Sequence, residues 1–222
     1  MIEALDLDEG LARLGAVDGP AAALPSESRD KLVAYLELLF KWNRTYNLTA
    51  IREPARMVTH HVLDALVVLP HLRDKTMDSA HAGLRMLDVG SGSGVPAIPL
   101  AIARPSWHVV ALDSSHKKGA FLQQAVIELR LSNVEAVIAR VEDYVPPASF
   151  DIVISRAFSD LATFVETSAR HLADGGQLVA MKGVYPDEEI ALLPSAFRVV
   201  AAPTLAVPGL DAQRHLIIME RA

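Results

Sequence analysis

Residues 86–94 combine a carboxylate and three glycines in a spacing that could bind a nucleotide-type ligand. A short apolar run ends at Asp88, and Gly90, Gly92 and Gly94 follow at alternate positions. Because glycine has no Cβ, this spacing lets the backbone turn tightly and leaves main-chain amides free to donate to a ligand. An apolar helical pattern follows the loop. A strand, a glycine loop and a helix in this order indicate a nucleotide-type site.

The details of the loop favour one ligand over another. The dinucleotide fingerprint G-x-G-x-x-G fails, because Val95 stands where the third glycine belongs. Asp88 would repel a pyrophosphate but suits the cationic amino acid end of S-adenosylmethionine. Asp113 ends the next apolar run and could accept both hydroxyls of a ribose. The two acids favour S-adenosylmethionine, and the alternative is a plain turn with Asp113 capping a helix beside Ser114 and Ser115.

Three further polar clusters follow apolar runs that we expect to be strands. Residues 139–143 offer a backbone amide and an acid that could read the amino group and a ring nitrogen of adenine. Arg156 follows the next run, and Lys182 follows the one after it. An arginine and a lysine leaving adjacent strand ends are poor core residues, so a functional role is favoured over packing.

The second half of the chain alternates strand-like and helical patterns, which predicts a doubly wound α/β fold whose mostly parallel sheet is covered on both faces. The expected strands span residues 84–89, 108–112, 134–138, 151–154, 177–181, 197–207 and 216–220. Between the last two, Pro208 and Gly209 form a turn without a helical run, which predicts an antiparallel hairpin at or near one edge. This seven-stranded, Rossmann-like sheet is the architecture of S-adenosylmethionine-dependent methyltransferases.

The first part of the chain has a different character. We expect a weakly ordered acidic leader over residues 1–30 with a short helix around 5–14, a helical extension and linker over 31–83, and a methyltransferase domain over 84–222.

Two helices are expected in the extension, one ending near Trp42 and one opening at Pro54. His61 and Asp64 lie three residues apart on the second helix and can touch each other. Spacing alone favours a surface or packing pair over a functional one.

Composition excludes several classes of protein. The 222 residues contain no cysteine, which excludes disulfides, zinc thiolate sites and a cysteine nucleophile, and disfavours methylation of pyrimidine C5. No apolar run approaches the roughly twenty residues that span a bilayer, so we expect a cytoplasmic protein. The net charge of -6 comes mostly from residues 1–30, which hold seven acids and two bases. The remainder is nearly neutral, so bulk charge gives no support for nucleic-acid binding.

With these motifs in place, the chain resembles the small-subunit ribosomal RNA guanine-N7 methyltransferases, the glucose-inhibited division protein B family. The resemblance covers nearly everything from Leu32 to Ile218. It is carried by Trp42-Asn43, Tyr46-Asn47-Leu48-Thr49, His61-x-x-Asp64, the run from Asp88 to Pro96 with Ile98-Pro99-Leu100, Asp113-Ser114-x-x-Lys117-Lys118, Ser155-Arg156-Ala157, Lys182-Gly183 and Arg214-His215. Ala97 and Ala65 depart from the family's usual glycine and serine.

The resemblance implies methyl transfer from S-adenosylmethionine to N7 of a guanine in 16S ribosomal RNA near the decoding site, by a monomer that needs no metal and no membrane. The cofactor contacts are expected at Asp88, Gly90, Ser91, Gly92, Val95, Asp113, Ser114, Val141, Glu142 and Arg156. Arg156 and Lys182 are expected to hold the guanine O6 and nearby phosphates. Contacts with RNA are expected from Asn43, Asn47, His61, Lys117, Lys118 and Arg214, with Arg52 and Arg56 as further candidates.

The residue chemistry agrees with this acceptor. N7 of guanine bears no proton, so the enzyme needs orientation and charge management but no general base. The segment Ser155-Arg156-Ala157-Phe158 lacks the Asn/Asp-Pro-Pro-Tyr signature of enzymes that methylate exocyclic amines. Three alternatives stay open: a methyltransferase for small molecules or proteins, a non-catalytic adenosylmethionine-binding assembly factor and, more distantly, a nicotinamide dehydrogenase.

Overall fold

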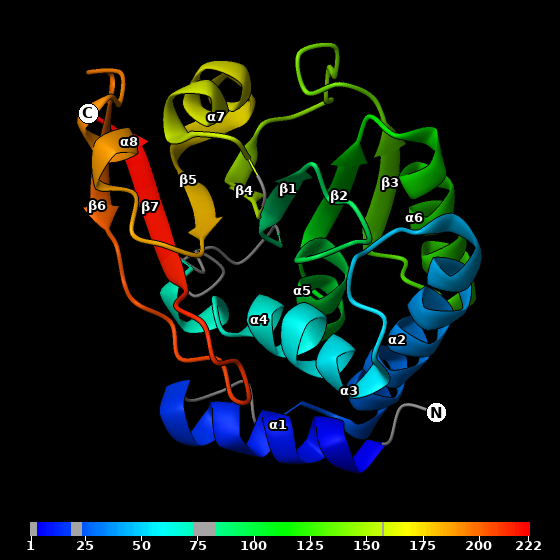
Figure 1. Cartoon of the computed structure of the whole chain (residues 1–222). Coiled ribbons are helices and arrows are strands. Elements are labelled where there is room, and N and C mark those ends of the chain that lie inside the picture. The colour runs from blue at the N-terminus through cyan, green and yellow to red at the C-terminus, as the bar shows by residue number, and fades with distance from the viewer. Residues whose placement is uncertain (1–3, 19–23, 73–82, 157) are drawn as a thin grey trace.

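A central sheet organises the molecule (Figure 1). The computed structural model describes residues 4–18, 24–72, 83–156 and 158–222. Within these residues seven strands form one sheet in the order β3-β2-β1-β4-β5-β7-β6. The strands are β1 (Arg85–Val89), β2 (His108–Asp113), β3 (Val134–Ile138), β4 (Phe150–Ser155), β5 (Leu172–Lys182), β6 (Phe197–Ala201) and β7 (His215–Arg221). Strands β1 to β5 are parallel, and β7 pairs antiparallel with both β5 and β6, so the predicted sheet and its C-terminal hairpin are confirmed.

The strand expected over residues 197–207 is shorter in the structure, because β6 ends at Ala201. Pro203 has no N–H to donate to a strand ladder, which stops regular pairing at this point. Beyond it, Thr204 forms only an isolated antiparallel bridge with His215. The connection to β7 is therefore a long loop that reaches toward the N-terminal helices (Figure 1).

Helices cover both faces of the sheet. They are α1 (Ala4–Asp18), α2 (Ser26–Tyr46), α3 (Pro54–Met57), η2 (Val58–Leu63), α4 (Asp64–Leu66), η3 (Leu69–His71), α5 (Ala97–Ala103), α6 (His116–Glu128), α7 (Leu161–Ser168), η5 (Ala169–His171) and α8 (Asp187–Ala191). Alternate residues of β2 pack on opposite faces, as the period of a strand requires. Val109 and Ala111 join the hydrophobic cluster formed with α5 and α6, whereas Val110 and Leu112 join the cluster formed with α7.

The N-terminal helix α1 is longer and better packed than the short helix expected within a weakly ordered leader. Leu7, Leu11 and Leu14 repeat on one face and are at most 2% exposed. They belong to the same hydrophobic cluster as α2, α5 and one face of the sheet. The expectation of weak order is therefore wrong for α1, because its apolar stripe has a partner in the folded chain. The division of the chain at residues 30 and 83 stays a prediction, and residues 73–82 of the expected linker lie outside the described residues.

The second helix of the extension is irregular. Between α3 and α4, residues Val58–Leu63 form the π-helical turn η2, which directly precedes Asp64. Such turns are rare and often mark functional sites. The first helix of the extension, α2, runs to Tyr46, which is past the expected end near Trp42. Asn47 ends this helix with φ of 49°, a left-handed conformation that asparagine tolerates.

Candidate functional site

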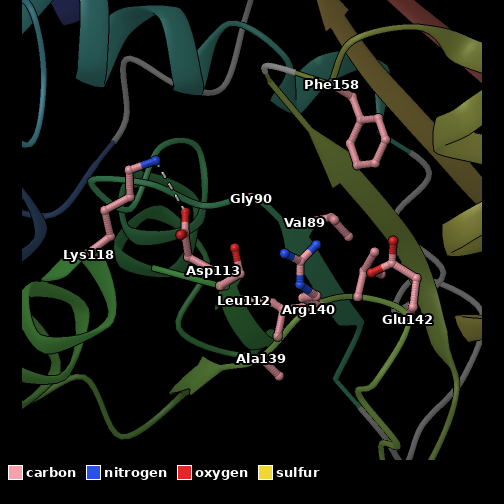
Figure 2. A pocket seen from close by; sticks show the side chains of 11 residues that line it. Val89, Gly90, Leu112, Asp113, Lys118, Ala139, Arg140, Glu142 and Phe158 are labelled. Atoms are coloured by element: carbon pink, nitrogen blue, oxygen red, sulfur yellow. Dashed lines mark ion pairs between the residues drawn. The ribbon is translucent and has the colours of Figure 1, made fainter. Parts of the chain in front are cut away.

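A cavity of about 340 Å³ opens at the carboxyl ends of β1, β2 and β3 (Figure 2). This is the edge where a doubly wound sheet binds its ligands. The lining residues are Val89, Gly90, Leu112, Asp113, Ser114, Lys118, Ala139, Arg140, Val141, Glu142 and Phe158. The structure thus brings together the glycine bend, the acid that ends β2 and the loop after β3, which come from three separate stretches of sequence.

The glycine bend shapes this cavity in a way that differs from the sequence expectation. The amides of Gly90 and Ser91 both donate to the Leu112 carbonyl at 2.9 Å, and the Gly92 amide donates to Asp113 Oδ2 at 2.8 Å. These three amides are therefore not free to donate to a ligand. Gly90 has φ of +74°, and a Cβ built on it meets nothing within 4 Å, so its missing side chain keeps the cavity open.

Asp88 lies below the bend and is fully buried. Its Oδ2 accepts from Ser91 Oγ at 2.6 Å and from the Ala97 amide at 3.2 Å, whereas its Oδ1 has no partner among the described residues. Burial raises the pKa of Asp88 to about 6, against the opposing effects of these two hydrogen bonds and the charge of Arg156. A buried acceptor without a partner is costly in the free protein, and a cationic donor would satisfy it.

Asp113 connects β2 to the bend and is only 5% exposed. Its Oδ1 accepts from the Ser115 amide at 2.9 Å, and its Oδ2 lies 3.6 Å from Lys118 Nζ (Figure 2). A carboxylate offers about four lone-pair sites, so Asp113 can hold the bend and still accept from a ligand hydroxyl. Lys118, predicted to contact RNA phosphate, is placed at the rim of this cavity.

A second cavity of about 260 Å³ lies at the ends of β4 and β5. Its lining residues are Asp64, Arg156, Met181, Lys182, Gly183 and Arg214. Asp64 is 2% exposed and holds two arginines from distant parts of the chain. Its Oδ2 accepts from Arg156 Nη1 at 3.3 Å, and its Oδ1 accepts from Arg214 Nε at 2.8 Å. Arg156 Nη1 also donates to the His60 carbonyl at 2.8 Å.

The charges around the second cavity are largely paired. Lys182 Nζ lies 2.7 Å from Glu189 Oε2, and Glu189 also accepts from the Leu161 amide. With Asp64 paired to two arginines, three cations face two carboxylates. The cavity therefore carries a small net positive charge, which suits a phosphate or the electronegative edge of a base.

The predicted site residues divide between the two cavities. Arg156, expected at the cofactor and as a catalytic group, lines the second cavity together with Lys182 and Arg214. Asp88, Ser91, Gly92 and Val95 do not line the first cavity but lie beneath it, and Asp88, Ser91 and Val95 are buried. They support the bend from inside.

The residues predicted to contact RNA have different surroundings. Asn43 is 3% exposed, and its side chain donates to the Ile51 carbonyl and accepts from the Thr49 amide. His61 is 1% exposed, and neither ring nitrogen has a partner among the described residues. Burial, together with the charges of Arg156 and His60, lowers the pKa of His61 to about 3. The geometry favours structural roles for Asn43 and His61, and their contact with RNA stays a prediction.

Asn47 and Lys117 lie together on the surface. Lys117 Nζ donates to the Asn47 carbonyl at 3.4 Å, and Arg52 Nη2 donates to Asn47 Oδ1 at 2.6 Å. These exposed groups from α2, α6 and the loop before α3 form a small basic patch. Their contact with RNA stays a prediction as well.

Sequence reasoning missed three residues of these sites. Asp64 is marked in the sequence by its spacing to His61 and by its place in a family motif, and neither predicts that it pairs with two arginines. Glu189 and Phe158 gave no local signal, because their relation to the cavities depends on the folded positions of α8 and the loop after β4. Among the described residues, no group of three or more His, Asp or Glu is placed to hold a metal ion, and no helix has both the length and the apolar character needed to cross a membrane.

Comparison with solved structures shows the fold. A glycopeptide N-methyltransferase complexed with S-adenosylmethionine superposes with a TM-score of 0.55 at 13% identity, covering 73% of this chain and 96% of that one. A SAM-dependent methyltransferase from Aquifex aeolicus gives a TM-score of 0.54 at 20% identity, covering 81% and 96% of the two chains. The predicted methyltransferase fold is confirmed.

Comparison of sequences is more specific. A protein of Laribacter hongkongensis named ribosomal RNA small subunit methyltransferase G is 53% identical over 96% of this chain and 95% of its own length. A protein of the same name from Nitrosospira multiformis is 49% identical over 100% and 99% of the two chains. The family model described as rRNA small subunit methyltransferase G matches residues 28–217. The chain is therefore an S-adenosylmethionine-dependent methyltransferase that belongs to the rRNA small subunit methyltransferase G family.

Proposed function

We propose that this enzyme transfers the methyl group of S-adenosylmethionine to N7 of a guanine in 16S ribosomal RNA near the decoding site. One observation carries the assignment of roles: two cavities lie at neighbouring strand ends, one beside buried acids and one lined by cations. The first suits the cofactor and the second suits a nucleotide of the RNA. Family membership supports the reaction and the RNA.

The residues that line the first cavity, together with Asp88 beneath it, fit S-adenosylmethionine. Asp88 offers a buried acceptor without a partner for the cationic amino acid end, and Asp113 offers a carboxylate for the ribose hydroxyls. Residues 139–142 line the part of the cavity that would hold the adenine. When bound, the cofactor supplies an electrophilic methyl group on a sulfonium centre.

The acceptor side requires orientation without proton removal. N7 of guanine presents a lone pair and no proton, so no residue acts as a general base. Arg156 is held on one side by Asp64 and the His60 carbonyl, which leaves the rest of its guanidinium to donate to O6 of the guanine. A fixed orientation of the acceptor atom is the main contribution that such a residue makes to the rate.

Charge must also be balanced, because the guanine becomes cationic when N7 is methylated. If Arg156, Lys182 and Arg214 had no anionic partners, their positive charges would oppose this change. The carboxylates of Asp64 and Glu189 offset two of them, and an RNA phosphate would offset the third. Lys182 and Arg214 thus position the phosphate, while Asp64 and Glu189 reduce the positive electrostatic potential at the guanine base.

The RNA strand would continue across the surface patch of Asn47, Arg52 and Lys117. Phosphate contacts of this kind position an RNA without reading its sequence. We further propose that the enzyme acts in the cytoplasm as a single copy, and light scattering of the purified protein tests the second point directly.

Arg156 provides the test of the assignment. Small subunits from cells lacking this gene would be incubated with S-adenosylmethionine, and N7 methylation would be mapped by mass spectrometry of the 16S RNA. Arg156→Ala should abolish or severely reduce methylation while retaining cofactor binding. Arg198→Ala, which removes an exposed arginine from the edge strand β6, serves as the control. Wild-type turnover by Arg156→Ala would remove this residue from the mechanism, and cofactor binding without methylation by the wild-type protein would favour an assembly factor.

A further inference from the structure

Arg170, in the turn η5 after α7, holds the loop that follows β3 from behind. Its Nη2 donates to the carbonyl groups of Val141 at 2.9 Å and Tyr144 at 3.2 Å, and to that of Glu142. One guanidinium nitrogen therefore faces three carbonyl groups within four consecutive residues. Residues 139–142 of this loop line the first cavity on its other side.

His171 strengthens the same contact. Its Nε2 lies 3.0 Å from the Val141 carbonyl and 3.3 Å from Arg170 Nε. Burial lowers the pKa of His171, so the ring is neutral and one ring nitrogen carries its hydrogen. With the hydrogen on Nδ1, Nε2 accepts from Arg170 Nε, which orients the guanidinium toward the loop.

The hydrogen bond to the Val141 carbonyl also fixes the direction of the Glu142 N–H, because both groups belong to one planar peptide. In a trans peptide the C=O of one residue and the N–H of the next point in opposite directions. Because the Val141 carbonyl is turned toward Arg170, the Glu142 N–H is turned away from it, on the side of the cavity. The Asp143 amide is already used by the Arg140 carbonyl at 3.1 Å, whereas no backbone partner of the Glu142 amide occurs among the described residues.

We propose that Arg170 is a positioning residue for the adenine end of the cofactor: it fixes residues 141–144 so that the Glu142 N–H donates to N1 of the adenine. This inference rests on the proposed cofactor site. Arg170 itself touches neither the cofactor nor the RNA.

The effect should be specific to the adenine ring. A main-chain N–H can donate to N1 of adenine, which is an acceptor, but not to N1 of hypoxanthine, which carries a hydrogen. S-Adenosylhomocysteine and S-inosylhomocysteine differ at this edge of the base. A residue that orients the amide sets the preference between them, whereas a residue that only stabilises the fold would change the affinity for both equally.

Calorimetric titration of the full-length protein with both compounds tests the proposal. Arg170→Ala should weaken binding of S-adenosylhomocysteine about five- to tenfold, which corresponds to the loss of about one hydrogen bond, and should reduce the preference over the inosyl compound by a similar factor. In turnover assays, KM for S-adenosylmethionine should rise while kcat at saturating cofactor stays unchanged. Arg170→Lys should lie between the two, because an ammonium group can still reach a carbonyl.

Arg221→Ala is the matched control. Arg221 is an exposed arginine that donates to the Ala169 carbonyl at 2.8 Å, in the same turn η5, but does not contact the loop. It should keep the affinity and preference of the wild-type protein. Wild-type behaviour of both Arg170 variants, or an equal loss for both compounds, would overturn the proposal. Failure of the wild-type protein to bind either compound would instead refute the cofactor site on which it rests.

Discussion

Asp64 Oδ2 accepts a hydrogen bond from Arg156 Nη1 at 3.3 Å, which joins the N-terminal helical extension to the end of β4. The other oxygen of the same carboxylate holds Arg214, which is 150 positions away in the sequence. Asp64 follows the π-helical turn η2, so the irregular part of this helix supplies a central anion of the second cavity. The extension therefore contributes a lining residue to the second cavity, which we propose orients the acceptor.

We expect Asp64→Asn to reduce both stability and activity. The asparagine side chain would have about the same size but no charge, and both arginines would lose their ionic partner. The arginine side chains are 29% and 24% exposed, so solvent screens part of the effect, and we expect a loss of about 1–3 kcal/mol in the free energy of unfolding. Turnover should fall about tenfold to a hundredfold, because Arg156 is no longer fixed. Urea unfolding and methylation assays measure the two effects, with the exposed Asp174→Asn as control.

Cofactor affinity should depend on pH through Asp88. The pKa of this carboxyl is raised to about 6 by burial, so it is largely protonated below pH 6 and cannot pair with a cation. Binding of S-adenosylmethionine should weaken as the pH falls through 6, by at most about tenfold per pH unit, and should level off above it. Asp88→Asn should bind weakly at every pH and lack this dependence. A pH-independent affinity of the wild-type protein between pH 5 and 7 would contradict the role of Asp88.

His61 should make the fold sensitive to acid. Its pKa is lowered to about 3 in the folded chain from 6.5 in the unfolded chain, so unfolding takes up a proton between these values. The stability that the neutral ring contributes is complete above pH 6.5 and is lost as the pH falls toward 3. Between pH 6.5 and pH 5, the free energy of unfolding should therefore fall less for His61→Leu than for the wild-type protein. The difference between the two decreases should be at most about 2 kcal/mol. Denaturant unfolding at the two pH values measures this, and the exposed His116→Leu should behave as the wild-type protein does.

Helix α1 should contribute to global stability. Leu11 is 2% exposed in the shared hydrophobic cluster, and Leu11→Ala should lower the free energy of unfolding by about 2–4 kcal/mol through lost burial and the cavity left behind. Arg13→Ala, on the exposed face of the same helix, should change it by less than about 0.5 kcal/mol. Equal unfolding midpoints for the two variants would mean that α1 behaves as the weakly ordered leader expected from its composition.

Local patterns in the sequence determined the framework of this protein. The alternation of apolar runs predicted the strands and helices, because burial on one or both faces leaves a period in the sequence. The carboxylate of Asp88 and the glycines after it predicted a bend at the position of the first cavity, because a tight bend after a strand needs residues without Cβ atoms. Motifs along most of the chain predicted the family, and comparison with its members confirms it.

Tertiary structure alone decided how these parts act together. The sequence did not predict that the amides of Gly90, Ser91 and Gly92 are used within the protein, because their acceptors belong to β2 and the residue that ends it. Nor did it predict that Asp64 pairs with Arg156 and Arg214, or that Arg170 holds the loop after β3. Each of these contacts joins residues at least 21 positions apart. Periodicity and spacing report only on neighbours along the chain, whereas these contacts exist because folding brings distant side chains and carbonyl groups within hydrogen-bonding distance.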